Sequence, residues 1–227
     1  MALAGYEDLA GIIDHWLVGP ELTAGQVVEG LELAQRYRVA CATVRPCDID
    51  LAARVLRGSA VKPASVCGFP HGWQNTGVKL YEFRDLLRRG AKEVEWAIAT
   101  SALLSREFQH VQTELAQAAA MAKQEGVVLK AALETAALSE ELKIIACRCL
   151  ERAEVAFASI PAAMDDLELF RKYLPEEIGV QVRGELDKLD EAIELEAAGC
   201  SRMATGATAA LLEQWKARLA AARPADG

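Results

Sequence analysis

Two hydrophobic periodicities alternate along the whole chain, and this alternation limits the folds that it can adopt. Short apolar runs, rich in β-formers or small residues, occupy residues 12–13, 41–44, 64–67, 93–98, 127–133, 155–157, 178–182 and 202–204. Charged or turn-forming residues bound each run, which is typical of buried parallel strands. Longer stretches with helical spacing separate the runs. The pattern therefore predicts eight strand–helix units.

The first helical stretch has a recognisable start and a buried face. Thr23 is placed as an N-cap, and Leu31, Ala34 and Tyr37 follow at helical spacing as an apolar stripe. Two further stretches begin near residues 139–142 and 164–167 with acidic residues in the first turn, where the helix dipole favours them.

Eight such units within 227 residues predict an α/β fold, a single (β/α)8 barrel that spans residues 1–227 as one domain. A doubly wound open sheet is the alternative, but it usually carries a glycine-rich first βα turn, and residues 11–16 offer none. Residues 220–227 are rich in alanine, include Pro224, and are expected to fray.

The bulk composition excludes several classes of partner. A net charge of -8 and a pI near 5.1 argue against nucleic acid, and the scattered basic residues argue against an anionic membrane surface. No apolar run approaches the roughly 18 residues that cross a bilayer. The N-terminus lacks a basic region followed by an apolar stretch, so we expect no secretory signal and a cytoplasmic protein.

The cysteines and histidines do not predict a metal site. The six cysteines are expected to be reduced thiols, because the chain is long and no secretory signal is visible. His15, His71 and His110 are far apart, and no zinc-ligand spacing appears. We therefore expect neither a metal nor another cofactor.

Four motifs, in order along the chain, carry a resemblance to the deoxyribose-phosphate aldolase family. IDHWL at residues 13–17, followed by Pro20, is similar to the family's Ile-Asp-His-Thr-Leu-x-x-Pro. VCGFPHG at residues 66–72 is similar to its strand-three motif, EVE at 93–95 to Glu-Val-Asp, and LKAALET at 129–135 to Leu-Lys-Val-Ile-Ile-Glu-Thr. The resemblance covers nearly the whole chain and implies a class I aldolase barrel, a carbon–carbon lyase that forms a Schiff base on a lysine. It also implies a homodimer.

The resemblance fails where the aldolase chemistry would be. The family's strand six reads Phe-Val-Lys-Thr-Ser-Thr-Gly, and here VAFASIP at residues 155–161 sets Phe157 at the lysine and retains Ser159. A second lysine, on strand seven, would lower the pKa of the first, and Gln181 takes its place. The phosphate-facing Gly-Gly becomes Gly184-Glu185, and Gly-Thr-Ser-Ser becomes ATGA at residues 204–207. These changes all map to the predicted barrel mouth.

The candidate site follows from the strand ends and from the resemblance. The candidate catalytic residues are Glu95, which matches the family's proton-relay aspartate, and Lys130. The candidate pocket-lining residues are Asp14, His15, Thr43, Arg45, His71, Glu134, Phe157, Ser159, Gln181, Arg183, Gly184 and Gly206.

Several of these residues have two interpretations. Lys130 is either an interior lysine paired with Glu95 or Asp14, or a relocated Schiff-base amine. Arg45 and Arg183 either bind a carboxylate or phosphate at the mouth or lie on the surface. His15 is either a core residue or half of an Asp–His dyad with Asp14.

Three functions therefore remain open. The first is a barrel unable to perform Schiff-base cleavage, a pseudoenzyme or partner subunit with a plugged mouth and an exposed apolar patch for a protein partner. The second is an enzyme with altered chemistry on a small carbonyl or carboxylate ligand, with an open pocket. The third is an active aldolase that uses Lys130.

Overall fold

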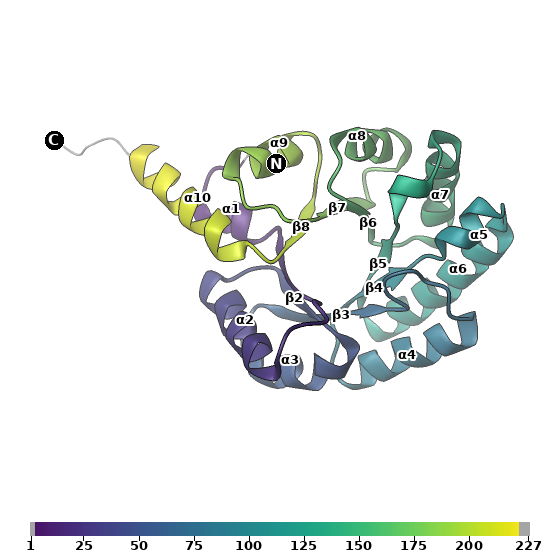
Figure 1. The fold of residues 1–227 in the computed structure, drawn as a ribbon, viewed down its shortest axis with the longest axis horizontal. Coiled ribbons are helices and arrows are strands. Elements are labelled where there is room, and N and C mark those ends of the chain that lie inside the picture. Colours follow the sequence, from purple (N-terminus) through teal and green to yellow (C-terminus); the bar gives the residue numbers. More distant parts are fainter. Residues whose placement is uncertain (1–2, 223–227) are drawn as a thin grey trace.

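The strands form a closed parallel barrel in a computed structural model of the chain, which describes residues 3–222. They are β1 (Ile13–Leu17), β2 (Cys41–Val44), β3 (Lys62–Cys67), β4 (Glu93–Ala97), β5 (Val128–Ala132), β6 (Phe157–Pro161), β7 (Gly179–Arg183) and β8 (Arg202–Thr205). Each strand pairs in parallel with its neighbours in the sequence, and β8 pairs with β1 to close the ring (Figure 1). The predicted (β/α)8 barrel is confirmed.

Helices alternate with the strands and surround the barrel (Figure 1). They are α1 (Tyr6–Ala10), α2 (Ala24–Tyr37), α3 (Ile49–Val55), α4 (Thr76–Arg88), α5 (Thr100–Leu104), α6 (Phe108–Glu125), α7 (Glu140–Ala153), α8 (Met164–Tyr173), α9 (Leu189–Ala197) and α10 (Thr208–Ala222), with short 3-10 helices at Pro46–Asp48 and Thr135–Ala137. Among residues 3–222, no helix is long and apolar enough to cross a membrane. Of the predicted frayed tail, residues 220–222 belong to α10, and 223–227 lie outside the described residues.

The predicted helix starts are found at α2 and α7. The Thr23 side chain accepts a hydrogen bond of 3.3 Å from the Gln26 backbone nitrogen, and Ser139 caps α7 in the same way through Leu142. Leu31 and Ala34 are completely buried on the inner face of α2. Capping satisfies backbone donors that the first turn leaves free, and the apolar stripe packs the helix against the barrel.

Strand β6 begins two residues later than the sixth predicted run begins. Helix α7 extends to Ala153, and Glu154 ends it in a left-handed conformation with φ 53°. The chain then needs residues 155–156 to return to the barrel, so Phe157 is the first residue of β6. Phe157 therefore lies at the amino-terminal end of the barrel, opposite the mouth to which the sequence interpretation assigned it.

Period-two alternation separates the two faces of every strand. Outward residues such as Val94, Ala131 and Ile160 are completely buried in the apolar layer between strands and helices. The inward positions include most of the polar residues that the sequence singled out. The barrel interior is thus the place where the candidate site residues can meet.

Candidate functional site

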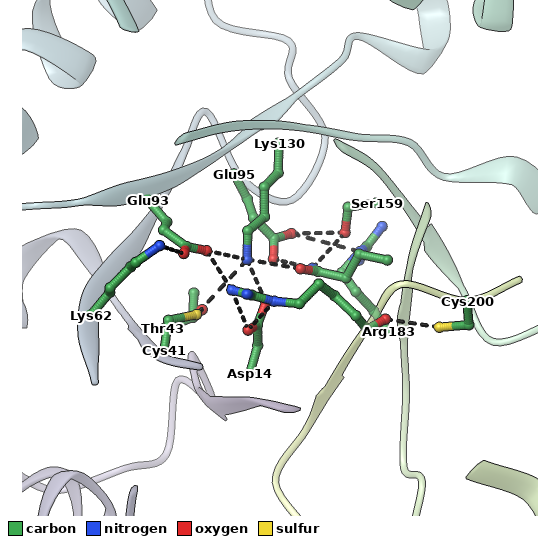
Figure 2. A network of polar contacts seen from close by, with 12 residues as sticks. Asp14, Cys41, Thr43, Lys62, Glu93, Glu95, Lys130, Ser159, Arg183 and Cys200 are labelled. Carbon is green, nitrogen blue, oxygen red and sulfur yellow. Dashed lines mark hydrogen bonds and ion pairs between the residues drawn. The ribbon is translucent and has the colours of Figure 1, made fainter. Parts of the chain in front are cut away.

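Four buried charged side chains form a network of ion pairs in the half of the barrel nearer the amino ends of the strands (Figure 2). The Lys130 ammonium contacts the Asp14 carboxylate and lies 2.8 Å from the Glu93 Oε2 atom. The Arg202 Nη2 atom lies 2.8 Å from both carboxylates. Two buried cations thus face two buried anions in this group, which we call the ionic quartet, and the half-exposed Lys62 adds a third cation 3.2 Å from the Glu93 Oε1 atom.

The ionic quartet confirms one prediction and extends it. Asp14 pairs with Lys130, as one of the two expected pairings requires, whereas Glu95 is not a direct partner of Lys130. Glu93 and Arg202 were missed. Alternation contained a signal for Glu93, because it lies two residues before Glu95 and so shares its inward face.

The ionic quartet keeps Lys130 charged. Burial alone lowers the pKa of Lys130, but the charges of Asp14 and Glu93 outweigh it and raise that pKa above its usual value. Burial likewise opposes the charge on Glu93, yet Lys130 and Arg202 lower the pKa of Glu93 to about 2. Lys130 is therefore held as an ammonium rather than as the free amine that Schiff-base formation needs.

Cys41 completes the lower network without adding a nucleophile. Its Sγ atom lies 3.8 Å from the Lys130 Nζ atom. Burial, reinforced by the charge of Asp14, raises the pKa of the Cys41 thiol well above its usual value, so it stays protonated. The ligand atoms of Asp14, Cys41 and Glu93 lie within 4.8 Å of one another, but Lys130 and Arg202 already neutralise both carboxylates. This grouping is an ion-pair network of the protein.

Above the ionic quartet lies a second group made of Glu95, Ser159 and Gln181. The Ser159 hydroxyl donates a hydrogen bond of 3.1 Å to Glu95, and the Gln181 amide nitrogen donates to both of them. The Gln181 carbonyl oxygen accepts a hydrogen bond of 2.8 Å from Lys130, which links the two groups. All three side chains are at most 1% exposed. Glu95 thus has hydrogen-bond donors on both sides but no adjacent amine.

The two predicted arginines at the mouth are already paired. Arg183 donates to the Leu133 carbonyl oxygen at 2.9 Å and to Glu134 at 3.1 Å, and its Nε atom lies 3.8 Å from Glu95 (Figure 2). Arg45 donates to Asp48 at 2.7 Å and to the Gly19 carbonyl oxygen at 3.4 Å. Both guanidinium groups therefore bind acids of the same chain.

A hollow of about 580 Å³ lies at the mouth, at the carboxyl ends of β1, β7 and β8. Its lining includes Trp16, Phe69, Leu22, Arg183, Glu21 and Glu185, together with His15, Gly184 and Gly206. The rings of Trp16 and Phe69 meet edge to face with centroids 5.7 Å apart. The mouth is thus hollowed, and Trp16 forms part of its wall rather than filling it.

Phe157 does not line this hollow. Its ring lies beneath the ionic quartet, with its centroid 5.8 Å from the Lys130 ammonium and 5.6 Å from the Arg202 guanidinium. A Cβ atom on Gly179 would come within 2.4 Å of the same ring, so glycine is required there. Phe157 is therefore separated from the hollow at the mouth, because residue 157 begins β6 at the far end of the barrel.

Neither of the two predicted histidines reaches the polar groups inside the barrel. His15 points toward α10, where its Nδ1 atom is 2.9 Å from the Thr208 hydroxyl oxygen, and desolvation lowers its pKa to about 4. Since Asp14 faces the opposite side of β1, no Asp–His dyad forms. His71 is exposed and packs against Trp73, with ring centroids 4.4 Å apart. Thr43 is completely buried beside Cys41.

The closed parallel barrel, with a hollow at the carboxyl ends of its strands, defines a protein of the TIM-barrel class. The chain is 31% identical over 217 residues to the deoxyribose-phosphate aldolase of Caldanaerobacter subterraneus subsp. tengcongensis, a match that covers 92% of this chain and 94% of the relative. It is 30% identical to that of Rhodopirellula baltica, over 96% and 94% of the two chains. The chain therefore belongs to the deoxyribose-phosphate aldolase family.

Solved structures agree on the fold. An aldolase called QR15 superimposes with a TM-score of 0.88 at 24% identity, over 95% of this chain and 99% of that one. The deoxyribose phosphate aldolase of Aeropyrum pernix, described as a tetramer, gives 0.85 at 24% identity over 94% and 93%. No protein-family model matches the chain.

Proposed function

We propose that this barrel does not perform Schiff-base aldol cleavage and acts as a ligand-binding pseudoenzyme or partner subunit of its family. The observation that supports this proposal most strongly is the burial and ion pairing of Lys130. Lys130 is completely buried, pairs with two carboxylates and contacts the Gln181 amide. Even an ordinary lysine is a free amine in only about one molecule in a thousand at pH 7, and the raised pKa of Lys130 reduces that fraction further.

The residues around Glu95 support the same proposal. Ser159 and Gln181 occupy the inward positions of β6 and β7 beside it, and neither carries an amine. Of the buried lysines in the described chain, Lys79 binds Glu114 and the Ala97 carbonyl oxygen outside the lumen. Among residues 3–222, these contacts therefore leave no interior amine positioned to attack a carbonyl.

A second candidate function is altered chemistry in the same barrel. The hollow at the mouth favours it, because a ligand can enter above Arg183 and Glu95. Each of Arg45 and Arg183 already pairs with an acid of the same chain, which counts against a carboxylate ligand, although the buried Nε atom of Arg183 has no hydrogen-bond partner. The third candidate, an active aldolase that uses Lys130, requires the ionic quartet to open.

A turnover assay tests the proposal. The protein is incubated with deoxyribose 5-phosphate, and released acetaldehyde is measured through a coupled alcohol dehydrogenase, with the Caldanaerobacter relative as positive control. We expect no release above the rate without protein. Saturable turnover that the Lys130→Met variant abolishes would contradict the proposal and favour the third candidate. The expected homodimer stays a prediction, for which sedimentation analysis is the test.

A further inference from the structure

Arg183 is anchored through a single nitrogen atom of its guanidinium group. The Nη2 atom donates hydrogen bonds to the Leu133 carbonyl oxygen at 2.9 Å and to Glu134 at 3.1 Å. The Nε atom is buried and has no hydrogen-bond partner among residues 3–222. A buried donor of a charged group without an acceptor is unfavourable, so this nitrogen is stabilised by an acceptor that the chain itself does not supply.

The same side chain lines the hollow at the mouth and approaches Glu95 in the barrel interior. The Arg183 side chain is 11% exposed, and its Nε atom lies 3.8 Å from the Glu95 Oε2 atom, too far for a direct hydrogen bond. One oxygen atom can, however, lie within hydrogen-bond distance of both atoms. Because both anchoring bonds hold Nη2, the guanidinium group can turn about that atom and present Nε to an oxygen that enters from the hollow.

The charges around Arg183 favour an uncharged group at this position. Glu134 pairs with Arg183 and Glu95 lies nearby, so two carboxylates already face one guanidinium group. Glu21 and Glu185 line the same hollow and add negative charge. These groups would repel a carboxylate or a phosphate. A hydroxyl group avoids the repulsion, because its oxygen can accept from Arg183 while its proton is donated to Glu95.

The wall of the hollow beside Arg183 suits a hydrocarbon body. The Phe69 ring centroid lies 6.0 Å from the Arg183 guanidinium carbon and 5.7 Å from the Trp16 ring centroid, and Leu22 adds aliphatic surface. We infer that the mouth binds a small neutral alcohol, whose hydroxyl group bridges Arg183 and Glu95 and whose hydrocarbon part packs against the two rings. This inference rests on the proposed function, because it takes the mouth to bind a ligand without cleaving it.

Three probes that share a cyclopentane ring test the inference: cyclopentanol, chlorocyclopentane and cyclopentanecarboxylate. Chlorine has nearly the size of a hydroxyl group but forms no strong hydrogen bond, and the carboxylate adds a negative charge. Dissociation constants are measured by ligand-observed NMR titration at low ionic strength, where charge effects are least screened. Each probe is compared between the wild type and a variant, which cancels the different hydration of the free probes. In the wild type, we expect cyclopentanol to bind more tightly than the carboxylate.

The variant Arg183→Met supplies the decisive comparison. Methionine keeps an apolar stem in the hollow but removes every N–H donor of the side chain. Cyclopentanol should bind about tenfold more weakly than in the wild type, whereas chlorocyclopentane should change by less than about twofold. Arg45→Met is the matched control, because Arg45 also lies at the mouth and pairs with Asp48 but does not line the hollow. It should leave the affinity of all three probes unchanged.

A second variant, Glu134→Gln, tests the position of the bound group without removing the arginine. The Glu134 side chain is 41% exposed, so its replacement should not disturb folding, which circular dichroism checks for every variant. The substitution removes one carboxylate beside Arg183. Cyclopentanecarboxylate should therefore gain about tenfold in affinity, while cyclopentanol should change by less than about twofold.

Four results would overturn the inference. They are no measurable binding of cyclopentanol, equal losses for cyclopentanol and chlorocyclopentane in Arg183→Met, the same loss for cyclopentanol in Arg45→Met, and no gain for the carboxylate in Glu134→Gln. None of them bears on whether the barrel cleaves an aldol, since the probes contain no aldehyde or ketone and form no Schiff base. Conversely, turnover of deoxyribose 5-phosphate would refute the proposed function, and the probes would still measure whether an alcohol binds at Arg183.

Discussion

Ser159 and Gln181 are register partners on β6 and β7, and the Gln181 amide donates a hydrogen bond of 2.9 Å to the Ser159 hydroxyl. Both lie beside Glu95. In the family resemblance, the reactive amine and the lysine that lowers its pKa belong to these same two strands. The pairing therefore indicates that the reactive position corresponds to Ser159 rather than to Phe157.

Installing two lysines at this pair should create a reactive amine. In Ser159→Lys with Gln181→Lys, each ammonium lowers the pKa of the other, so one becomes a free amine near neutral pH. We expect the double variant, treated with acetaldehyde and borohydride, to yield a covalent ethyl adduct at position 159. The added bulk should cost about 1–3 kcal/mol of stability, which circular dichroism and urea unfolding will measure.

Phe157→Lys with Gln181→Lys is the matched control for that experiment. Residue 157 lies at the amino-terminal end of the barrel, beneath the ionic quartet and away from the hollow. A lysine there should give no adduct above the level seen for surface lysines. If residue 157 rather than residue 159 became labelled, the assignment drawn from strand register would be wrong.

Opening the ionic quartet should destabilise the protein. Asp14→Asn leaves the buried Lys130 and Arg202, together with the half-exposed Lys62, facing the single carboxylate of Glu93. We expect the free energy of unfolding to fall by about 3–5 kcal/mol, because one buried charge loses its counter-charge. Urea unfolding measures the change, and Glu177→Gln, a surface substitution, should alter stability by no more than about 0.5 kcal/mol.

A compensating substitution separates charge balance from packing. In Asp14→Asn with Lys130→Met, the buried Arg202 and Glu93 remain paired, and the half-exposed Lys62 still contacts Glu93 from outside. The double variant should therefore be less destabilised than the sum of the two single variants. Strict additivity would show that the ionic quartet does not act as a unit.

The stability of the protein should fall at acidic pH because His15 is buried in its neutral form. Desolvation lowers the pKa of His15 from about 6.5 to about 4 in the folded state, so the unfolded chain binds the proton more readily. The stability that His15 contributes is complete above pH 6.5 and is lost as the pH falls toward 4. The loss should be roughly 3 kcal/mol, since each pKa unit corresponds to about 1.4 kcal/mol.

The variant His15→Gln isolates this effect. Urea unfolding at several pH values between 7.5 and 4 should show a shallower decline for the variant than for the wild type, whatever its stability at neutral pH. Parallel curves would mean that another group is responsible for the pH dependence.

The sequence was sufficient for the architecture because each strand is short, apolar and bounded. It also predicted that Lys130 pairs with Glu95 or Asp14, of which Asp14 is the partner, since strand alternation turned Lys130 inward and a buried lysine needs a carboxylate. It did not predict the position of each side chain along the barrel axis. That position depends on where the preceding helix ends. Because α7 ends at Glu154, β6 begins two residues later than predicted, and Phe157 lies at the far end of the barrel.

The sequence also did not predict the partners of long, flexible side chains. Arg202 begins β8, yet its guanidinium reaches Asp14 and Glu93 across the interior. Arg183 was expected to face a ligand, but it binds Glu134 of β5's following loop. Alternation predicts which face a residue takes, whereas the partner of a flexible side chain depends on the closed barrel.

Borohydride trapping of the wild-type protein tests the central claim most directly. The protein is incubated with deoxyribose 5-phosphate or with acetaldehyde, reduced, and analysed by intact mass and peptide mapping, with and without the carbonyl compound. We predict no adduct above the background of surface lysines. A stoichiometric, substrate-dependent adduct on Lys130 would contradict the account, because it would show that the ionic quartet opens and releases a working amine.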